Sequence, residues 1–224
     1  MTRLGVLGGT FNPIHLGHLR AAEEVAEALA LDRVLLVPSA QPPHKAGGDA
    51  LAPGAVRLAW VEAACAGNPR LAASDVEVAR GGASYTVDTL RALAEEYAGR
   101  PVFIIGSDAF AELGTWREPK QLFALADFAV IARPGTPGRL ADWIPEALRG
   151  ELALEPGGQS ARHRATNGEL RAVAIPALAI SSSDIRERIR RGRSIRYLVP
   201  EAVRRDIAAR GVYSRDWQGD LARS

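Results

Sequence analysis

The chain has 224 residues, 47% of them hydrophobic and 24% charged, which is typical of a folded globular protein with a sizeable apolar core. The formal net charge of +2 does not indicate a nucleic-acid partner, and no apolar run is long enough to span a membrane. Cys65 is the only cysteine, which excludes an internal disulfide, and the first residues lack the apolar stretch of a signal peptide. We therefore expect a cytoplasmic protein without nucleic-acid or membrane partners.

Short apolar runs alternate with helical patterns along the first 133 residues. In chain order, the expected elements are a strand at 3–7, a helix at 16–31, strand 33–37, helix 55–66, strand 72–78, helix 84–98, strand 101–105 and strand 128–132. Strands separated by helices of this length form parallel βαβ units with right-handed crossovers. The sequence therefore predicts an α/β fold with a doubly wound parallel sheet.

The remainder of the chain is less regular. Residues 134–170 show no clear period and are rich in Pro and Gly, so we expect an irregular excursion, either a loop or a small hairpin. A last strand at 171–180 and helices at 181–191 and 200–210 are expected to follow. We interpret residues 1–224 as one domain, with a core at 1–133 and 171–191, the excursion at about 134–170, and C-terminal helices at about 181–213.

The stretch "GGTFNPIHLGHL", residues 8–19, follows the first predicted strand. In doubly wound sheets ligands bind where a strand ends and a helix begins, and Gly8 and Gly9 would let the backbone approach a ligand closely and adopt dihedral angles that other residues avoid. The helix N-terminus would direct unpaired N–H groups at the same place, and His15 and His18 could donate hydrogen bonds into one anionic site. The spacing is neither GxGxxG nor a P-loop. Metal ligation by the two histidines, or simple helix capping, is the alternative.

A second anion-binding segment is predicted near the C-terminus, in "ISSSDIRERIRRGRSIRYLVPEAV". Ser181, Ser182 and Ser183 precede a helical pattern, and Asp184 lies three residues after Ser181, as in a capping box. Arg186 in the first turn adds a planar charged group that can bind phosphate. An ordinary capped helix with solvated arginines is the alternative.

Four intermediate segments supply further candidates, each with an ordinary alternative. Lys45 in "PPHK" is one of two lysines, although it could be a solvated loop residue. Gly106 and Asp108 in "IGSDAF" could approach and bind ribose hydroxyls, or form a helix N-terminus. Trp116 in "LGTWRE" could stack on a heteroaromatic ring or pack in the core. Arg133 in "IARPG" could contact an anion or form a surface salt bridge.

The segment "GTFNPIHLGH" resembles the GxFxPxHxGH signature of the nucleotidyltransferase superfamily, which includes the class I aminoacyl-tRNA synthetases. It is similar still more closely to the nicotinate-nucleotide adenylyltransferase family, although that family usually has aspartate at the position of Asn12. The late "ISSSDIR" resembles the ISSTxIR motif of the same family, with Ser183 in place of threonine. The intermediate segments and "SYTVDTL" at 84–90 resemble the family in the same order, so the resemblance covers most of 1–133 and 171–213.

The resemblance implies a Rossmann-like nucleotidyltransferase fold with a small C-terminal helical part. It implies transfer of AMP from ATP to nicotinate mononucleotide, giving nicotinate adenine dinucleotide and pyrophosphate in NAD biosynthesis. The attacking phosphate oxygen is already anionic, so alignment and charge stabilisation suffice for direct in-line attack, with no covalent intermediate. Mg²⁺ is expected to arrive on the ATP phosphates, since no dedicated metal site is evident in the sequence.

The family roles transfer residue by residue to this chain. The resemblance implies that His15, His18 and Arg186 are catalytic. The residues expected to contact ATP and its phosphates are Gly8, Gly9, Thr10, Phe11, Lys45, Gly106, Asp108, Arg133, Ser181, Ser182 and Ser183. The residues expected to contact nicotinate mononucleotide are Tyr85, Thr86 and Trp116.

Several alternatives remain open at the level of the sequence. Pantetheine-phosphate adenylyltransferases have the same signature, and nicotinamide mononucleotide differs from nicotinate mononucleotide by a few hydrogen bonds. A nucleotide-sensing module would keep the fold without the catalysis, and a tRNA-binding role would require a basic appended domain. The sequence is also compatible with a homo-oligomer.

Overall fold

The computed structural model describes residues 2–42, 51–132, 139–176 and 178–217, so the candidates Lys45 and Arg133 lie outside the described residues. Within them, one sheet of eight strands has the order β3-β2-β1-β4-β5-β8-β7-β6. The parallel strands are β1 (Leu4–Gly9), β2 (Arg33–Pro38), β3 (Leu71–Ala73), β4 (Val102–Gly106), β5 (Asp127–Ile131) and β8 (Glu169–Val173). The strands β6 (Leu152–Leu154) and β7 (Ser160–His163) are antiparallel to their neighbours. The predicted doubly wound α/β sheet is confirmed.

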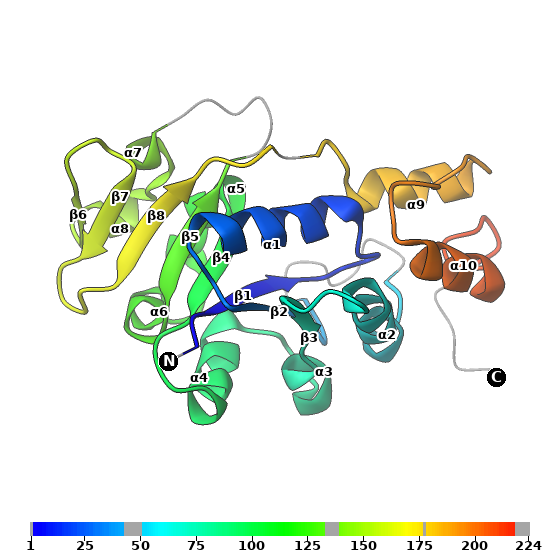
Figure 1. Ribbon diagram of the computed structural model, residues 1–224, viewed down its shortest axis with the longest axis horizontal. Helices are drawn as coiled ribbons and strands as arrows, with labels where there is room; N and C mark the ends of the chain where they lie inside the picture. The colour runs from blue at the N-terminus through cyan, green and yellow to red at the C-terminus, as the bar shows by residue number, and fades with distance from the viewer. Residues whose placement is uncertain (1, 43–50, 133–138, 177, 218–224) are drawn as a thin grey trace.

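Two layers of helices cover the two faces of this sheet, and Figure 1 shows α1 and α4 on opposite sides of β1. One apolar cluster is formed with α1 (Leu16–Ala28), α2 (Gly54–Cys65), α9 (Ser182–Arg190) and α10 (Glu201–Arg210). The other is formed with α3 (Val76–Arg80), α4 (Thr86–Glu96), α5 (Ser107–Ala111), α6 (Pro119–Leu125), α7 (Leu140–Trp143) and α8 (Glu146–Arg149). Successive strand residues point to opposite faces, so Leu36 belongs to the first cluster and Leu35 and Val37 to the second.

Several stretches differ from the sequence-based expectation. The helices α5 and α6 occupy residues between the strands at 101–105 and 128–132, where no element was predicted. The strand expected at 72–78 ends at Ala73, and its second half forms the short helix α3. The apparent alternation there was misleading because Glu77 is the buried residue of the helix, where it accepts a hydrogen bond from the Thr89 hydroxyl at 2.5 Å. This is a tertiary contact that local periodicity cannot reveal.

Of the two alternatives expected for the excursion, the small hairpin is present, but the segment is more ordered than an irregular excursion. Residues 139–163 contain α7 and α8 and the β6–β7 hairpin, and this hairpin joins the main sheet through antiparallel pairing of β7 with β8. Leu140, Ile144, Leu148 and Leu152 are all buried. In the sequence these apolar residues recur every four positions, a spacing that indicates a buried helical face. The helices and the strand here are so short that a search for long periodic segments does not detect it.

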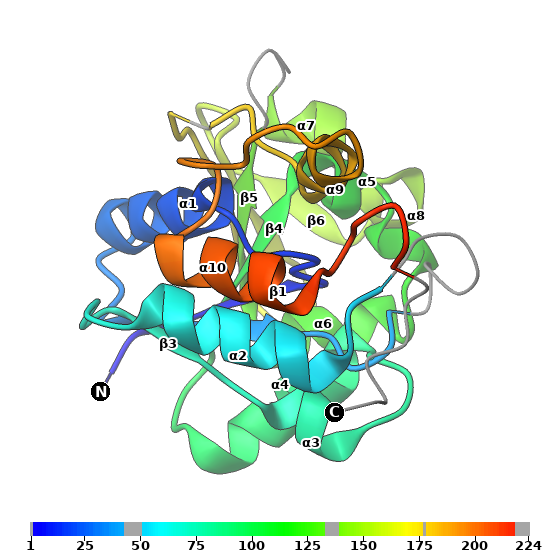
Figure 2. The same ribbon diagram turned by 90° about the vertical axis from the view of Figure 1, so that its right-hand side faces the viewer.

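The C-terminal helices return to the carboxyl ends of the central strands. The strand expected at 171–180 is wrong in its bounds, because β8 spans Glu169–Val173 and residues 174–176 and 178–180 form no strand. The helices α9 and α10 follow close to their predicted positions. Figure 2 shows α10 lying beside α2, where the Trp60 indole N–H donates to Asp206 at 2.7 Å. In the described part of the chain no helix is both long enough and apolar enough to cross a membrane.

Candidate active site

The loop of residues 10–15, here called the signature loop, connects β1 to α1. Gly8 and Gly9 are the last two residues of β1 and lack positive φ angles, whereas Phe11 has φ +46°. The expectation that the two glycines take the unusual turn conformation is therefore wrong. A Cβ on Gly9 would lie 3.0 Å from Cε1 of Phe11, so the small residue makes room for the buried Phe11 ring.

The two histidines of the signature occupy the start of α1, as predicted. His15 is the N-cap residue and His18 lies in the first turn. Their rings are stacked, with centroids 3.6 Å apart and an angle of 18° between the planes. The His15 backbone N–H donates to Nδ1 of His18 at 3.3 Å, and a nitrogen that accepts cannot be protonated, so the proton of His18 is on Nε2.

Burial favours the neutral form of the His15 imidazole. His15 is 5% exposed, and burial lowers its pKa to about 4. At neutral pH His15 therefore acts through hydrogen bonding rather than through positive charge. Among the described residues, no group of three or more His, Cys, Asp and Glu side chains is arranged to hold a metal ion.

Gly17, between the two histidines, is required by close packing. A Cβ at this position would lie 3.0 Å from Nδ1 and 3.1 Å from Cε1 of His15. It would also contact Cβ of Ile180, in the segment that leads into α9, at 3.7 Å. A side chain at residue 17 would thus push the His15 imidazole by a few tenths of an ångström, which gives the "HLGH" spacing a steric reason.

The N-terminus of α9 meets the signature loop, so the two motifs that are far apart in the sequence lie together. The Ser182 hydroxyl donates to the carbonyl of Pro13 at 2.9 Å, across 169 positions. Arg186 donates through Nη1 to the carbonyl of Asn12 at 2.9 Å, across 174 positions. Arg186 is 3% exposed, so its charge is buried directly behind the loop.

The other serines of the late motif arrange the helix start. The hydroxyl of Ser181 accepts the N–H of Asp184 at 3.1 Å, which confirms the predicted N-cap. Arg186 also donates through Nη2 to the Ser183 hydroxyl at 3.4 Å. Ser182 and Arg186 therefore have structural contacts with the loop and helix that the sequence did not predict, in addition to any contact with phosphate.

Arg57 is a residue of the site that sequence reasoning missed. It is fully buried on α2 and donates to three backbone carbonyls, those of Thr10 (2.7 Å), Ala52 (2.8 Å) and Ala40 (3.0 Å). In the sequence, Arg57 stands three residues before Trp60, so the two side chains lie on the same face of α2. A large aromatic residue on that face was the one indication that Arg57 is buried. Sequence alone gives no reason to place a charge there.

Gly106 and Asp108 lie at the carboxyl end of β4, next to β1 in the sheet. A Cβ on Gly106 would meet no atom within 4 Å, so the space beside this residue is open. Asp108 is exposed in the first turn of α5. Both residues lie at the carboxyl edge of the sheet, and Gly106 is the N-cap residue of α5, so the alternative of a helix N-terminus is confirmed.

The residues expected to contact nicotinate mononucleotide also lie at this edge. Tyr85 is the N-cap residue of α4 and Thr86 its first residue. Trp116 follows a short 3₁₀ helix (Leu113–Thr115) and packs edge-on against Phe103 of β4, with ring centroids 6.4 Å apart. Phe103 is in turn 3.6 Å from the position of a Cβ on Gly8, so the tryptophan and the signature strand pack against the same aromatic ring.

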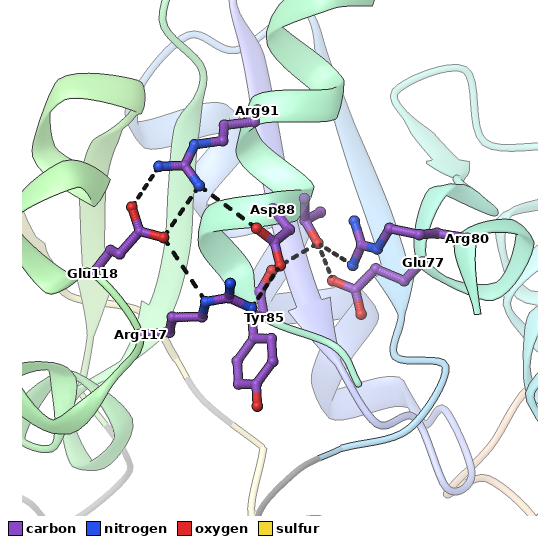
Figure 3. A network of polar contacts seen from close by, with 8 residues as sticks. Glu77, Arg80, Tyr85, Asp88, Arg91, Arg117 and Glu118 are labelled. Carbon is purple, nitrogen blue, oxygen red and sulfur yellow. Dashed lines mark hydrogen bonds and ion pairs between the residues drawn. The ribbon is translucent and has the colours of Figure 1, made fainter. Parts of the chain in front are cut away.

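A network of charged side chains fixes the segment after Trp116 to α4 (Figure 3). Arg91 forms an ion pair with Glu118 at 2.5 Å, and Arg117 approaches Asp88 at 3.4 Å. The guanidinium carbon of Arg117 lies 4.8 Å from the centroid of the Tyr85 ring. These exposed pairs add little stability individually, but together they hold Arg117 over Tyr85.

Comparison with known proteins agrees with this geometry. Residues 6–188 match the model of the cytidylyltransferase-like family. The chain is 46% identical over 216 residues to a Geobacter sulfurreducens protein named "Probable nicotinate-nucleotide adenylyltransferase", covering 96% of this chain and 99% of that protein. A Chromohalobacter salexigens protein of the same name is 46% identical over 215 residues, covering 95% and 96% of the two chains.

Solved structures show the same fold at lower identity. The nicotinic acid mononucleotide adenylyltransferase of Plasmodium falciparum, solved in complex with NaAD, has a TM-score of 0.70 at 17% identity, covering 95% of this chain and 98% of that one. A Vibrio parahaemolyticus structure titled "The Crystal Structure of a Putative Nicotinate-nucleotide Adenylyltransferase" has a TM-score of 0.62 at 19% identity, covering 98% of this chain and 100% of that one. With both sequence motifs assembled at one edge of the sheet and the relatives matching over nearly their full length, the chain belongs to the nicotinate-nucleotide adenylyltransferase family.

Proposed function

We propose that this protein transfers AMP from ATP to nicotinate mononucleotide, producing nicotinate adenine dinucleotide and pyrophosphate. The observation that supports this most strongly is the contact of α9 with the signature loop through Ser182 and Arg186. It brings a second helix N-terminus and a buried guanidinium to the start of α1, where His15 and His18 are stacked. Two helix N-termini and several N–H donors at one place suit a polyphosphate.

The chemistry requires alignment rather than proton abstraction. An oxygen of the nicotinate mononucleotide phosphate forms a bond to the α-phosphorus of ATP, while the bond from that phosphorus to the bridging oxygen of pyrophosphate breaks. Charge increases on the oxygens around the α-phosphorus and on the leaving pyrophosphate. We assign the Nε2–H of His18 and the N–H groups at the start of α1 to this charge, because preorganised donors stabilise it without reorganisation.

The late motif and the candidates outside the described residues complete the proposed phosphate site. We assign Ser182, Ser183 and Arg186 to the leaving pyrophosphate, and Lys45 and Arg133 to further phosphate contacts, on the resemblance of their segments to the family. Mg²⁺ enters in this proposal as part of the substrate, bound to the ATP phosphates. Gly106 and Asp108 are assigned to the ATP ribose region.

The pyridine ring is assigned to the surface between α4 and Trp116. Tyr85 and Trp116 offer aromatic faces, and the Thr86 backbone lies at the positive end of the α4 dipole. Arg117 adds a positive charge above Tyr85. Arg117 shares its charge with Asp88 and Glu118, so the N–H groups at the start of α4 are the main donors for a ring carboxylate. These donors favour a carboxylate over a neutral amide, which supports nicotinate rather than nicotinamide mononucleotide as the acceptor.

The test is pyrophosphate release from ATP and Mg²⁺ with three acceptors measured in parallel: nicotinate mononucleotide, nicotinamide mononucleotide and phosphopantetheine. We expect the highest kcat/KM with nicotinate mononucleotide, together with formation of its dinucleotide. Preference for phosphopantetheine would assign the protein to a different reaction. No release with any acceptor would indicate a nucleotide-binding module that retains the fold without the catalysis.

A further inference from the structure

We infer that Arg57 is a positioning residue for the adenylyl transfer, because its guanidinium connects the signature loop to the segment that carries the nicotinate mononucleotide residues. The inference rests on the proposed function. Arg57 touches neither proposed substrate site directly, since all of its hydrogen bonds within the described residues go to backbone carbonyls.

The three carbonyls belong to three separate segments at the carboxyl edge of the sheet. Thr10 begins the signature loop, Ala40 follows β2, and Ala52 precedes α2. A guanidinium directs its donors in a fixed planar fork, so three carbonyls bonded to one Arg are fixed relative to one another. Asn12 contributes to the same arrangement, since its Oδ1 accepts the N–H of Ala52 at 3.0 Å.

The chain at Ala40 extends this link to the other half of the site. The N–H of Ala40 donates to the Ser84 hydroxyl at 2.8 Å, and the N–H of Ser84 donates to the carbonyl of Gln41 at 3.0 Å. Ser84 directly precedes Tyr85, the N-cap residue of α4. A continuous set of hydrogen bonds therefore runs from Thr10, through Arg57 and Ala40, to the residue beside the proposed pyridine surface.

Core stability gives no sufficient reason for an arginine at this position. Arg57 is fully buried, and in the described part of the chain it has no carboxylate within ion-pair distance. Glu77 and Tyr213 act on it only through longer-range electrostatics, and burial lowers its pKa. A buried charge without an ionic partner is costly, and an apolar side chain of similar volume is often equally stable. What an apolar side chain cannot supply is the three-way hydrogen-bonded connection.

The experiment compares Arg57→Lys, which keeps the positive charge but loses the fork, with Arg57→Met, which loses both. We expect kcat to fall about 10-fold to 100-fold in both variants, since small misplacements of aligned reactants have effects of that size. The KM values for ATP and nicotinate mononucleotide should stay within about three-fold, because no substrate contact is removed. All rates are expressed per folded molecule, from the unfolding curve of each variant.

Arg100→Lys is the matched control. Arg100 also donates to a backbone carbonyl, that of Thr166 at 3.2 Å, but it lies at the amino-terminal edge of the sheet, beside the start of β4. Its kcat should equal that of the unmodified protein. An Arg57→Lys variant with unchanged kcat, or losses in both Arg57 variants that are fully explained by the unfolded fraction, would overturn the inference.

Ser84→Ala tests the same connection without altering the core. This variant removes the hydroxyl that accepts from Ala40 and leaves Arg57 in place, so it provides a test even if the Arg57 variants do not fold. We expect kcat to fall about three-fold to 10-fold with both KM values nearly unchanged. Full activity in Ser84→Ala would contradict the proposed link. If the unmodified protein releases no pyrophosphate with any acceptor, the proposed function fails instead, which is a separate outcome.

Discussion

The hydroxyl of Tyr213 donates a hydrogen bond to Oδ1 of Asn12, joining two buried residues that are 201 positions apart. Tyr213 has φ +65°, and its ring packs against Trp60 and Trp217 with centroids 6.1 Å and 5.1 Å away. Burial raises the pKa of the Tyr213 hydroxyl, so it stays protonated and able to donate. Asn12 is therefore held at its side chain by Tyr213 and at its carbonyl by Arg186, both from the C-terminal part of the chain.

Tyr213→Phe should impair catalysis more than binding. The change removes one hydrogen bond and keeps the ring, so we expect the free energy of unfolding to fall by about 1 kcal/mol. The signature loop would lose one of its fixed points, and kcat should fall about three-fold to 10-fold. Pyrophosphate release and denaturant unfolding measure the two effects. Tyr97→Phe, at the far end of α4, is the control and should keep full kcat; an equal loss in both variants would argue against a role for Tyr213.

His18→Ala should lower kcat by about 10²-fold to 10³-fold, the usual effect of losing one preorganised transition-state donor. The free energy of unfolding should change far less than the rate, because the variant removes only a long hydrogen bond, at 3.3 Å, and the ring contacts of His18 with His15 and Phe11. His18→Asn places an acceptor near the position of Nδ1 but no donor near Nε2. It should be as inactive as the alanine variant, and turnover close to normal in either would remove His18 from the mechanism.

Gly17→Ala should disturb His15 directly. The added Cβ would lie 3.0 Å from the imidazole, which must move, and we expect kcat to fall at least about 10-fold. Alanine also favours the helix by about 1 kcal/mol over glycine, so stability need not decrease. Gly150→Ala is the control, since a Cβ there meets no atom within 4 Å and φ is −69°. Unchanged kcat in Gly17→Ala would show that the position of His15 is unimportant.

The stability of the protein should depend on pH through His15. Its pKa is about 4 in the folded protein and 6.5 without the protein environment, so between these values the unfolded chain binds more protons. The free energy of unfolding should therefore be fully developed above pH 6.5 and decrease as the pH falls toward 4, by up to about 3 kcal/mol from this group. Urea unfolding at several pH values measures the slope.

His15→Asn isolates this contribution. Burial also lowers the pKa of His163, so this histidine acts in the same direction as His15 in the unmodified protein. The difference in slope between the unmodified protein and the Asn variant belongs to His15 alone. Equal slopes for the two proteins would show that His15 titrates normally in the folded state.

Arg117→Gln should weaken nicotinate mononucleotide binding. The arginine lies over Tyr85 and is held by Asp88, so its loss removes a positive charge and releases the tyrosine ring. We expect KM for nicotinate mononucleotide to rise about three-fold to 10-fold, with KM for ATP unchanged and a smaller preference over nicotinamide mononucleotide. Arg162→Gln, an exposed arginine on β7, is the control. A parallel rise in both KM values would place the effect outside the pyridine subsite.

The alternation of apolar strands and amphipathic helices was enough to predict the doubly wound sheet, because each buried strand leaves a local pattern of period two or a continuous apolar run. The starts of these helices could be predicted as well, since α1 begins directly after His15 and Ser181 is the N-cap residue of α9 as predicted. The short elements could not be predicted, because α3 and the β6–β7 hairpin contain too few residues to show a periodic pattern. Their conformation depends on partners such as Thr89 and β8 that are distant in the sequence.

For the site, local sequence specifies which residue types are present and which helix N-termini they occupy, because capping and backbone N–H groups are local properties. Only the folded chain brings Arg186 and Tyr213 into hydrogen bonds with Asn12. In the same way, folding connects Thr10 to Ala40 through Arg57. It also places His15 and Ile180 so close to Gly17 that a side chain at residue 17 would be crowded. These are contacts between segments that are distant in the sequence. A charged or aromatic residue has the same letter in the sequence whether it faces water or, as here, a buried carbonyl, and only the packed chain determines which of the two it meets.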